Sequence, residues 1–549
     1  MKINPSADEV ANQSPPFVDV NLFTTDVALQ EAIGREGAPH ARERLTALGA
    51  VCGSAEAFER GRLANEYPPR LRTHDPKGRR CDVVEFHPAY HALMAQSMAA
   101  GLHCGSWEAD GSGAENVARA GAFFMTAQME AGHCCPLTMT NAAVPTLRLQ
   151  PELAQLWIPG ILSRSYDPAF APMTEKRSVT IGMGMTEKQG GTDVRANITR
   201  AEAVARRGAG REYILTGHKW FFSAPMSDAF LVLAQAREGL SCFLVPRHLP
   251  DDSVNALRLQ RLKDKLGNRS NASSEVEFHG AHGWLVGEEG RGVSAIIEMV
   301  TYTRLDCAVS SAGLMRLALA MAIHHAQHRT VFGRPLIEQP LMAHVLADLA
   351  LDVEAATALV FRLARSFDRA EDERAAAWRR LMTPVTKYWV CKIAPILVGE
   401  AMECLGGNGY VEENGIARIY REAPVNSIWE GSGNVMALDV LRVLQREPEV
   451  ARIVLQELAQ AIGGDRQLGA AHSRIAGLLH EPRLLDARGR ALLETIALTA
   501  AGTLLRAHAP AAVADAFIAT RLAGSPRRTY GQGLERADVQ TILERALPA

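Results

Sequence analysis

Long apolar runs, paired cysteines and a strong net charge are all missing from this sequence. No run of about 18 apolar residues is present, so no membrane-spanning helix is predicted. The first 20 residues lack the apolar segment of a signal peptide. Nine cysteines occur without a CxxC pair, which argues against a disulfide framework and against a structural zinc site. These absences predict a cytoplasmic protein with no metal centre and no membrane contact.

The composition is that of an ordinary soluble protein. Hydrophobic residues make up 47% of the chain and charged residues 22%. A net charge of −2 excludes a polyanion binder that works by bulk charge alone. The 549 residues exceed the usual scale of about 100–200 residues per domain, so several domains are expected.

The pattern of apolar residues divides the chain into four segments and predicts an α+β fold. Residues 1–181 indicate an N-terminal extension and a helical domain, and 182–289 a small antiparallel β domain. Residues 290–444 indicate a helical bundle, and 445–549 a compact C-terminal helical domain. The predicted strands are 213–215, 219–223, 230–233, 241–245, 257–262 and 275–278. The bundle helices are predicted at 295–327, 342–368, 374–391 and 393–405.

The most informative stretch is Ile428 to Asn434, which reads Ile-Trp-Glu-Gly-Ser-Gly-Asn. Glu430 lies between an aromatic residue and glycines, at the point where a polar segment enters an apolar helix. Gly431 and Gly433 permit close approach of the backbone to a ligand. Desolvation by Trp429 would raise the carboxyl pKa into the range of a general base. The alternative is a common helix cap, which this stretch alone favours.

Four other stretches combine glycine with groups that bind ligands. Gly182 to Asp193 suits a loop over a planar ligand, or else a mobile linker. Gly217 to Ser223 carries three consecutive aromatics that would stack on a ring system, or else form a buried strand. His328 to Gln339 places an arginine beside a glycine turn, which suits a phosphate, and Leu405 to Tyr410 ends a helix with three glycines. Each of the last two is also an ordinary feature of a helical protein.

In order, these five stretches resemble the signature motifs of the acyl-CoA dehydrogenase superfamily, over roughly residues 60–440. The resemblance implies FAD bound between the β domain and the bundle. It also implies that Glu430 is the catalytic base, which removes the proton alpha to a thioester while hydride leaves the beta carbon. Thr303 occupies the position of the base in another branch, so Glu430 is the remaining candidate.

The resemblance also implies a set of FAD contacts and a homotetramer, because Arg329, Phe332 and Gln339 would reach the FAD of a neighbouring subunit. Thr186 would bond near flavin N5 and Thr192 near the pyrophosphate. The implied cofactor-binding residues are Met183, Gly184, Met185, Thr186, Gly190, Gly191, Thr192, Phe221, Phe222, Ser223, Arg329, Phe332, Gln339, Gly406, Gly407, Ile428, Gly431, Gly433 and Asn434.

Within the superfamily, the chain is most similar to the branch of DNA-alkylation-response flavoproteins. Lys188 in place of a common proline, the stretch 262–273, the stretch 424–434 and the segment after 445 carry this similarity. It implies binding of double-stranded DNA by the C-terminal segment and weak dehydrogenation of isovaleryl-CoA-like substrates. The alternative is an ordinary metabolic short- or branched-chain acyl-CoA dehydrogenase whose C-terminal segment serves assembly. A third possibility is a flavin-bound protein that only shields DNA.

The charge pattern supports a DNA partner weakly. Residues 441–549 contain 14 arginines and no lysine against 11 acidic residues, a net charge of +3, while the remainder carries −5. Arginine richness is general, however, with 50 arginines and 9 lysines in the whole chain. Arg442, Arg446, Arg527 and Arg528 are the DNA-binding candidates, and the resemblance rather than the charge count carries that prediction.

Overall fold

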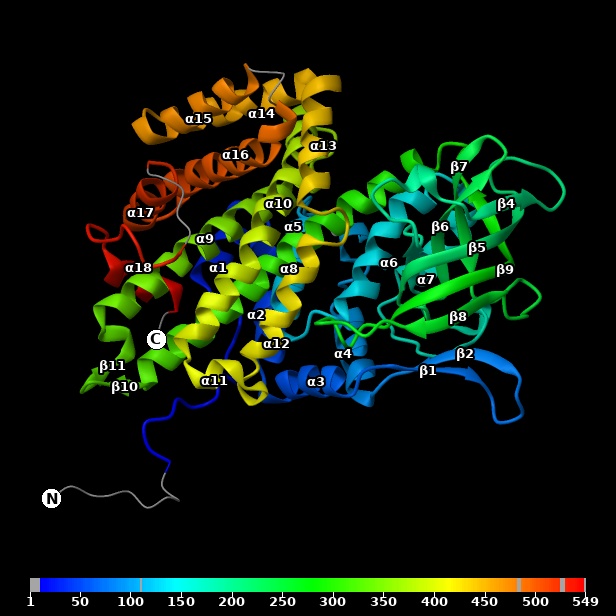
Figure 1. Ribbon diagram of the computed structural model, residues 1–549, viewed down its shortest axis with the longest axis horizontal. Coiled ribbons are helices and arrows are strands. Elements are labelled where there is room, and N and C mark those ends of the chain that lie inside the picture. The colour runs from blue at the N-terminus through cyan, green and yellow to red at the C-terminus, as the bar shows by residue number, and fades with distance from the viewer. Residues whose placement is uncertain (1–9, 109–110, 481–484, 524–528, 548–549) are drawn as a thin grey trace. The chain divides into compact units, whose positions relative to one another are not determined.

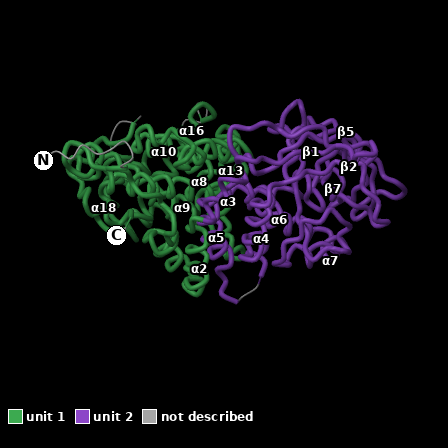
Figure 2. Tube along the Cα trace, turned by 90° about the horizontal axis from the view of Figure 1, so that it is seen from below, with its two compact units in different colours: residues 1–55, 307–549 green, residues 56–306 purple. Residues whose placement is uncertain are grey.

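The computed structural model describes residues 10–108, 111–480, 485–523 and 529–547 (Figure 1). Contacts between residues divide the chain into two compact units (Figure 2). The first unit contains residues 1–55 and 307–549, and the second contains residues 56–306. The Arg527 and Arg528 candidates lie outside the described residues.

The second unit begins with helices and one β-hairpin. Its helices are α3 (Ala55–Glu66), α4 (Pro88–Ala99), α5 (Glu115–Met129), α6 (Cys134–Leu147) and α7 (Pro151–Ile161). Strands β1 (Arg70–His74) and β2 (Arg80–Glu85) pair antiparallel, within a segment that the sequence predicted to form a helical domain. The hairpin escapes sequence analysis because charged residues dominate both strands and leave little apolar alternation.

A seven-stranded sheet follows in the second unit. Its strands are β3 (Ile181–Gly184), β4 (Arg200–Ala203), β5 (Glu212–Ser223), β6 (Ala229–Ala236), β7 (Gly239–Pro246), β8 (Leu257–Leu262) and β9 (Ser273–Val286). The order β3-β6-β4-β5-β9-β7 closes on itself because β6 also pairs with β7, while β8 pairs with β9. Most pairings are antiparallel, as predicted, but β3 and β4 each run parallel to β6.

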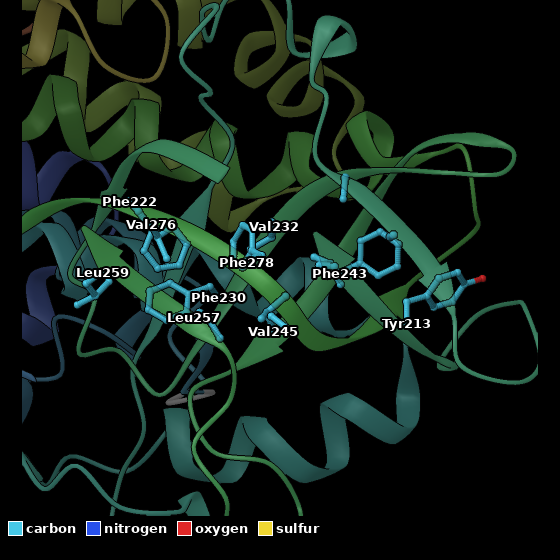
Figure 3. Close-up of a cluster of buried hydrophobic side chains, with 14 of the residues drawn as sticks. Tyr213, Phe222, Phe230, Val232, Phe243, Val245, Leu257, Leu259, Val276 and Phe278 are labelled. Atoms are coloured by element: carbon cyan, nitrogen blue, oxygen red, sulfur yellow. The ribbon is translucent and has the colours of Figure 1, made fainter. Parts of the chain in front are cut away.

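The sheet encloses an aromatic and aliphatic core (Figure 3). Phe222 from β5, Phe230 from β6 and Phe278 from β9 are at most 1% exposed. The Phe222 and Phe230 ring centroids lie 4.1 Å apart, a spacing at which aromatic pairs attract beyond simple burial. This core fixes which side chains of β5 remain available to a ligand.

The first unit is helical. It contains α1 (Val27–Arg35), α2 (Arg42–Cys52), α9 (Pro340–Asp368), α10 (Glu373–Cys404), α11 (Gly407–Tyr410), α12 (Ile416–Glu422) and α13 (Gly433–Arg446). The long helix α8 (Gly292–His328) begins in the second unit and ends in the first. Sequence analysis divided α10 into two helices, but it is continuous through Pro384 and Pro395. Burial of its faces in the bundle compensates for the bonds that the prolines remove.

The C-terminal helices pack on this bundle. They are α14 (Pro448–Ala461), α15 (Arg466–Leu479), α16 (Leu485–His508), α17 (Ala511–Arg521) and α18 (Val539–Ala546). Helix α16 packs against α9, α10 and α13, and α18 packs against α9 and α1.

Buried ion pairs hold these helices in place. Arg521 of α17 bonds Asp348 and Asp352 of α9, and the Asp352 pair measures 3.0 Å. Arg545 of α18 pairs with Glu354 at 2.8 Å and with Glu31. The segment after residue 445 is therefore an integral part of the first unit.

Helix α8 is the one helix in the described residues whose length and composition would allow it to cross a membrane. Its most apolar 18-residue window has a mean hydropathy of 1.4, and 89% of that window is buried inside the protein, as in a core helix. The described residues contain no group of three or more His, Cys, Asp or Glu side chains arranged to hold a metal.

Candidate functional site

The loop after β3 is organised around a buried carboxylate that sequence analysis did not select. Glu187 is fully buried and accepts hydrogen bonds from Lys219 Nζ at 2.7 Å and from the backbone N–H groups of Ile198 at 2.7 Å and Thr199 at 3.2 Å. Burial by itself would raise the pKa of Glu187, but Lys219 and these donors lower it to about 2. Glu187 is therefore ionised and ties both ends of the loop to β5.

Close packing requires a glycine at position 191 of this loop. A Cβ atom on Gly191 would collide with the Thr186 hydroxyl. The N–H of Trp220 donates to the Thr186 backbone oxygen at 2.8 Å, which joins the loop to the aromatic strand. Thr186 is half-buried and Thr192 is exposed, so both hydroxyls remain accessible. The structure thus brings the motif at 182–193 and the motif at 217–223 together within the second unit.

The last three side chains of β5 differ in their exposure to solvent. Phe221 is 51% exposed and Ser223 is half-buried, while Phe222 is fully buried in the β core. The prediction that Phe222 flanks the flavin ring therefore needs correction, because only its backbone can reach a ligand. Successive side chains of a strand point to opposite faces, which makes this outcome a consequence of the strand itself.

Cations stack on the same aromatic strand. Lys263 Nζ lies 3.3 Å from the Trp220 ring centroid and 4.9 Å from that of Phe221. Lys263 also pairs with Glu275 at 2.6 Å. Because such contacts fix both ring planes, Lys263 orients the side chains that the sequence predicts to stack on a flavin.

The remaining predicted residues of the second unit differ in how far they are buried. Met183 and Gly184 of β3 are buried, and Met185 is half-buried. A Cβ on Gly184 would lie 2.8 Å from the Phe222 ring, so this glycine serves packing of the strand. Gly190 is exposed in the loop.

In the first unit, Glu430 lies in a strained turn that leads into α13. Its φ angle is +57°, in the left-handed region that residues with a Cβ rarely adopt, and Gly431 follows with φ +102°. Helix α13 starts at Gly433, which confirms the predicted entry from loop to helix. A non-glycine residue in this conformation is typical of sites where function requires the strain.

Buried groups from α10 and α8 support this turn. Lys387 Nζ donates to the backbone oxygens of Trp429 and Gly431, at 2.8 and 2.5 Å. Trp429 Nε1 donates to Asn426 Oδ1 at 2.9 Å, and Asn426 Nδ2 donates to Ser311 Oγ at 3.1 Å. These supporting residues could not be predicted from the sequence, because they form no local motif around Glu430.

The residues beside the turn face different ways. Ile428 is 66% exposed, so it does not shield Glu430 from solvent. Gly433 is buried against Tyr388, and Asn434 is exposed with its Oδ1 accepting from Arg490 Nε at 2.8 Å. Arg490 belongs to α16, so the C-terminal helices touch the start of the motif helix.

The predicted phosphate motif forms a small hairpin in the first unit. Strands β10 (Thr330–Val331) and β11 (Arg334–Pro335) pair around a two-residue turn at Phe332 and Gly333. Both turn residues have positive φ, +51° and +80°, as a type I′ turn requires. Phe332 is nonetheless 98% exposed.

Two side chains of the same motif are already engaged. Arg329 donates to the Asn12 backbone oxygen, and Gln339 Nε2 donates to the Val331 oxygen at 3.0 Å.

The glycine motif at 405–410 is open to solvent. Gly406 and Gly407 are exposed, and a Cβ on either meets open space. Their backbone is accordingly accessible to a ligand.

Most described arginines of the C-terminal segment are bonded within the chain. Arg452, Arg506, Arg521 and Arg545 form ion pairs. Arg442 is 57% exposed by side chain, with Asp439 at 4.0 Å. Arg446, at the end of α13, is exposed. Arg442 and Arg446 are four residues apart on one helix and share a face.

Three family descriptions match successive parts of the chain. The adaptive response protein AidB N-terminal domain matches residues 12–168, the acyl-CoA dehydrogenase middle domain matches 182–281, and the acyl-CoA dehydrogenase C-terminal domain matches 290–445. Together with the fold and the motifs, these matches show that the chain belongs to the acyl-CoA dehydrogenase family of FAD-dependent enzymes.

Within that family, the chain is 50% identical to the putative acyl-CoA dehydrogenase AidB of Escherichia coli K12, over 92% of this chain and 93% of that protein. It is 30% identical to acyl-CoA dehydrogenase family member 11 of Caenorhabditis elegans, over 84% of this chain and 78% of that protein.

Two solved structures extend the similarity over nearly the whole chain. The structure of Caenorhabditis elegans ACDH-11 in complex with C11-CoA matches with a TM-score of 0.84 and 27% identity. The match covers 99% of this chain and 93% of that chain. That of the Bd2924 apo-form has a TM-score of 0.83 and 27% identity, and covers 91% of this chain and 99% of its own.

The second unit fits the planar and phosphate parts of FAD. It offers the exposed Phe221 ring for stacking, the hydroxyls of Thr186 and Thr192 for hydrogen bonds, and the exposed backbone of Gly190 and Gly191. Donor hydroxyls, an open aromatic face and close backbone approach are the chemistry that a flavin dinucleotide requires.

Proposed function

We propose that this protein is an FAD-dependent dehydrogenase of the DNA alkylation response that acts weakly on isovaleryl-CoA-like thioesters and binds double-stranded DNA. The main supporting observation is the left-handed turn at Glu430, the residue that the resemblance assigns as the base. The AidB N-terminal match and the 50% identity to AidB support the branch.

In the proposed reaction, the Glu430 carboxylate removes the proton alpha to the thioester carbonyl. The electron pair left on the alpha carbon forms a double bond to the beta carbon, which gives up its hydrogen as hydride. FAD, when bound, supplies the acceptor for that hydride. Trp429 beside the base is bulky and half-buried, which is consistent with a narrow acyl site and slow turnover.

The base assignment is tested by Glu430→Gln. We expect flavin reduction by isovaleryl-CoA, followed by anaerobic stopped-flow absorbance, to fall by at least a hundredfold, because general base catalysis contributes about 10²–10⁴-fold. FAD content should stay unchanged, since Glu430 is not among the proposed FAD contacts. A variant with normal FAD content and normal reduction would refute the assignment.

Structural support for a DNA site is limited, because ion pairs occupy Arg452, Arg506, Arg521 and Arg545 of the C-terminal segment. Arg442 and Arg446 project from the last turns of α13 with exposed side chains. Arg527 and Arg528 remain candidates from sequence alone. The DNA proposal rests mainly on the similarity to AidB, and the exposed pair tells an experiment where to begin.

The DNA proposal is tested by fluorescence anisotropy with a labelled duplex at several salt concentrations. Replacing Arg442 and Arg446 by alanine should weaken binding and reduce the salt slope by about 0.9 for each phosphate that is no longer neutralised. Arg452→Ala is the matched control, because Arg452 is similarly exposed but paired with Glu449. Equal binding by both variants and the intact protein would refute a site on α13.

A metabolic acyl-CoA dehydrogenase remains a second candidate. The ACDH-11 structure holds C11-CoA and covers 99% of this chain, so a C-terminal helical segment also occurs in a protein with an acyl-CoA bound. Fast flavin reduction by one member of an acyl-CoA panel, unaffected by duplex DNA, would favour this function. An inert flavin in a protein that protects DNA from alkylation would favour pure shielding.

Homotetramer formation is part of the same proposal. Phe332 is 98% exposed on a left-handed turn, in the motif that the resemblance assigns to the FAD of a neighbouring subunit. Its side chain is therefore proposed to meet a neighbouring subunit.

A further inference from the structure

A buried lysine of α10 is bonded to both sides of the proposed base. Lys387 is 1% exposed, although lysine is among the residues least often buried. Its Nζ donates to the Trp429 oxygen at 2.8 Å and to the Gly431 oxygen at 2.5 Å. These two residues immediately flank Glu430, so one side chain holds the backbone on both sides of it.

The turn needs such support. Glu430 adopts φ +57°, a left-handed conformation that is unfavourable for a residue with a Cβ. Strain of this kind persists only where the surroundings hold it. The two carbonyl groups that accept from Lys387 point toward one donor, which the relaxed right-handed conformation of Glu430 would not preserve.

A second set of bonds secures the same turn from its side-chain end. The Trp429 indole donates to Asn426, and Asn426 donates to Ser311, both of which are buried. This chain of bonds fixes the Trp429 ring, whereas Lys387 fixes the Trp429 and Gly431 carbonyls. Of the two sets, the Lys387 bonds are the ones that reach the backbone on each side of Glu430.

We propose that Lys387 is a positioning residue that holds the Glu430 turn in its left-handed conformation, so that the carboxylate meets the alpha carbon of the substrate. This inference rests on the proposed function of Glu430. Because a misplacement of about 1 Å can cost about a hundredfold in rate, removal of the two bonds should slow proton removal without changing how FAD or substrate binds.

The test is Lys387→Met in the full-length, FAD-loaded protein, since methionine keeps much of the length and lacks the donors. Lys392→Met is the matched control, because Lys392 lies on the same helix and is exposed. With isovaleryl-CoA, we expect the limiting rate of flavin reduction to fall ten- to a hundredfold in Lys387→Met. The half-saturating concentration and FAD content should change less than twofold. Lys392→Met should behave as the unmodified protein.

Two further measurements keep the test decisive if Lys387→Met binds FAD poorly. Lys387→Gln, which retains N–H donors on a shorter side chain, should recover part of the rate. Hydrogen–deuterium exchange followed by mass spectrometry should show faster exchange confined to residues 426–434 in both variants, whether or not the enzyme turns over.

An unchanged limiting rate with unchanged exchange would overturn the inference, as would an equal fall in rate, affinity and FAD content without any recovery in Lys387→Gln. Failure of the proposed function looks different. If Glu430→Gln keeps the full rate, the base assignment falls, while the exchange measurement still reports whether Lys387 holds the turn.

Discussion

The Glu187–Lys219 pair allows a quantitative test of how the proposed flavin loop is held. Both side chains are fully buried and lie 2.7 Å apart. Glu187→Gln keeps the size of the side chain but leaves the Lys219 ammonium buried without a counter-charge. Breaking a buried pair from one side costs about 3–5 kcal/mol. Burial lowers the pKa of Lys219 to about 8 even beside Glu187, so the ammonium depends on that carboxylate to stay charged.

The double variant Glu187→Gln, Lys219→Met should be more stable than either single variant, because it leaves no unpaired charge from this pair inside the β domain. The assay is the urea midpoint at which FAD fluorescence appears on release, which reports the loop and does not require two-state unfolding of a two-unit chain. Glu202→Gln on β4 is an exposed control expected within about 0.5 kcal/mol of the unmodified protein. Simple additivity of the two single variants, or an unchanged midpoint for either, would refute the reasoning.

The same pair predicts a pH dependence with a definite sign. The pKa of Glu187 is lower in the folded state, so its stabilisation is complete above about pH 4.5 and is lost as the pH falls toward 2. The midpoint of FAD release should therefore decline through that window, and Glu187→Gln should lack this part of the decline.

Three further changes have definite expected outcomes. Gly191→Ala should displace the Thr186 hydroxyl and lower FAD content at least tenfold, whereas Gly477→Ala on α15, which meets open space, should not; absorbance at 450 nm measures both. Phe332→Ala should leave the free energy of unfolding within about 0.5 kcal/mol yet shift light scattering toward smaller assemblies, and an unchanged mass would contradict the proposed contact. Arg521→Ala should destabilise the C-terminal helices by about 3–5 kcal/mol, because two buried carboxylates would be left without their partner; limited proteolysis that spares residues 485–523 would contradict this.

Sequence patterns predicted the features that depend on neighbouring residues. The entry of Glu430 into a helix follows from a polar segment, a glycine pair and an apolar helix in direct succession. The strands near 230–233, 241–245 and 257–262 were found because turn residues bound each of them. The fold class followed from the order of these local patterns.

What the sequence left hidden depends on contacts between distant segments. Lys387 supports a turn more than 40 residues later in the chain, and nothing near it marks that role. Glu187 looks like one acid in a polar loop, although four donors converge on it. The division of labour between Phe221 and Phe222 was predictable from strand alternation, but the run of aromatics suggested a single surface.

The ion pairs of Arg521 and Arg545 have a consequence for shortening the chain from its C-terminal end. Asp348, Asp352 and Glu354 belong to a bundle helix, yet their partners come from the last hundred residues. A protein without the last hundred residues would leave these three acids without their arginine partners, instead of being a smaller working enzyme. The last hundred residues are therefore not an independent module that truncation would remove cleanly.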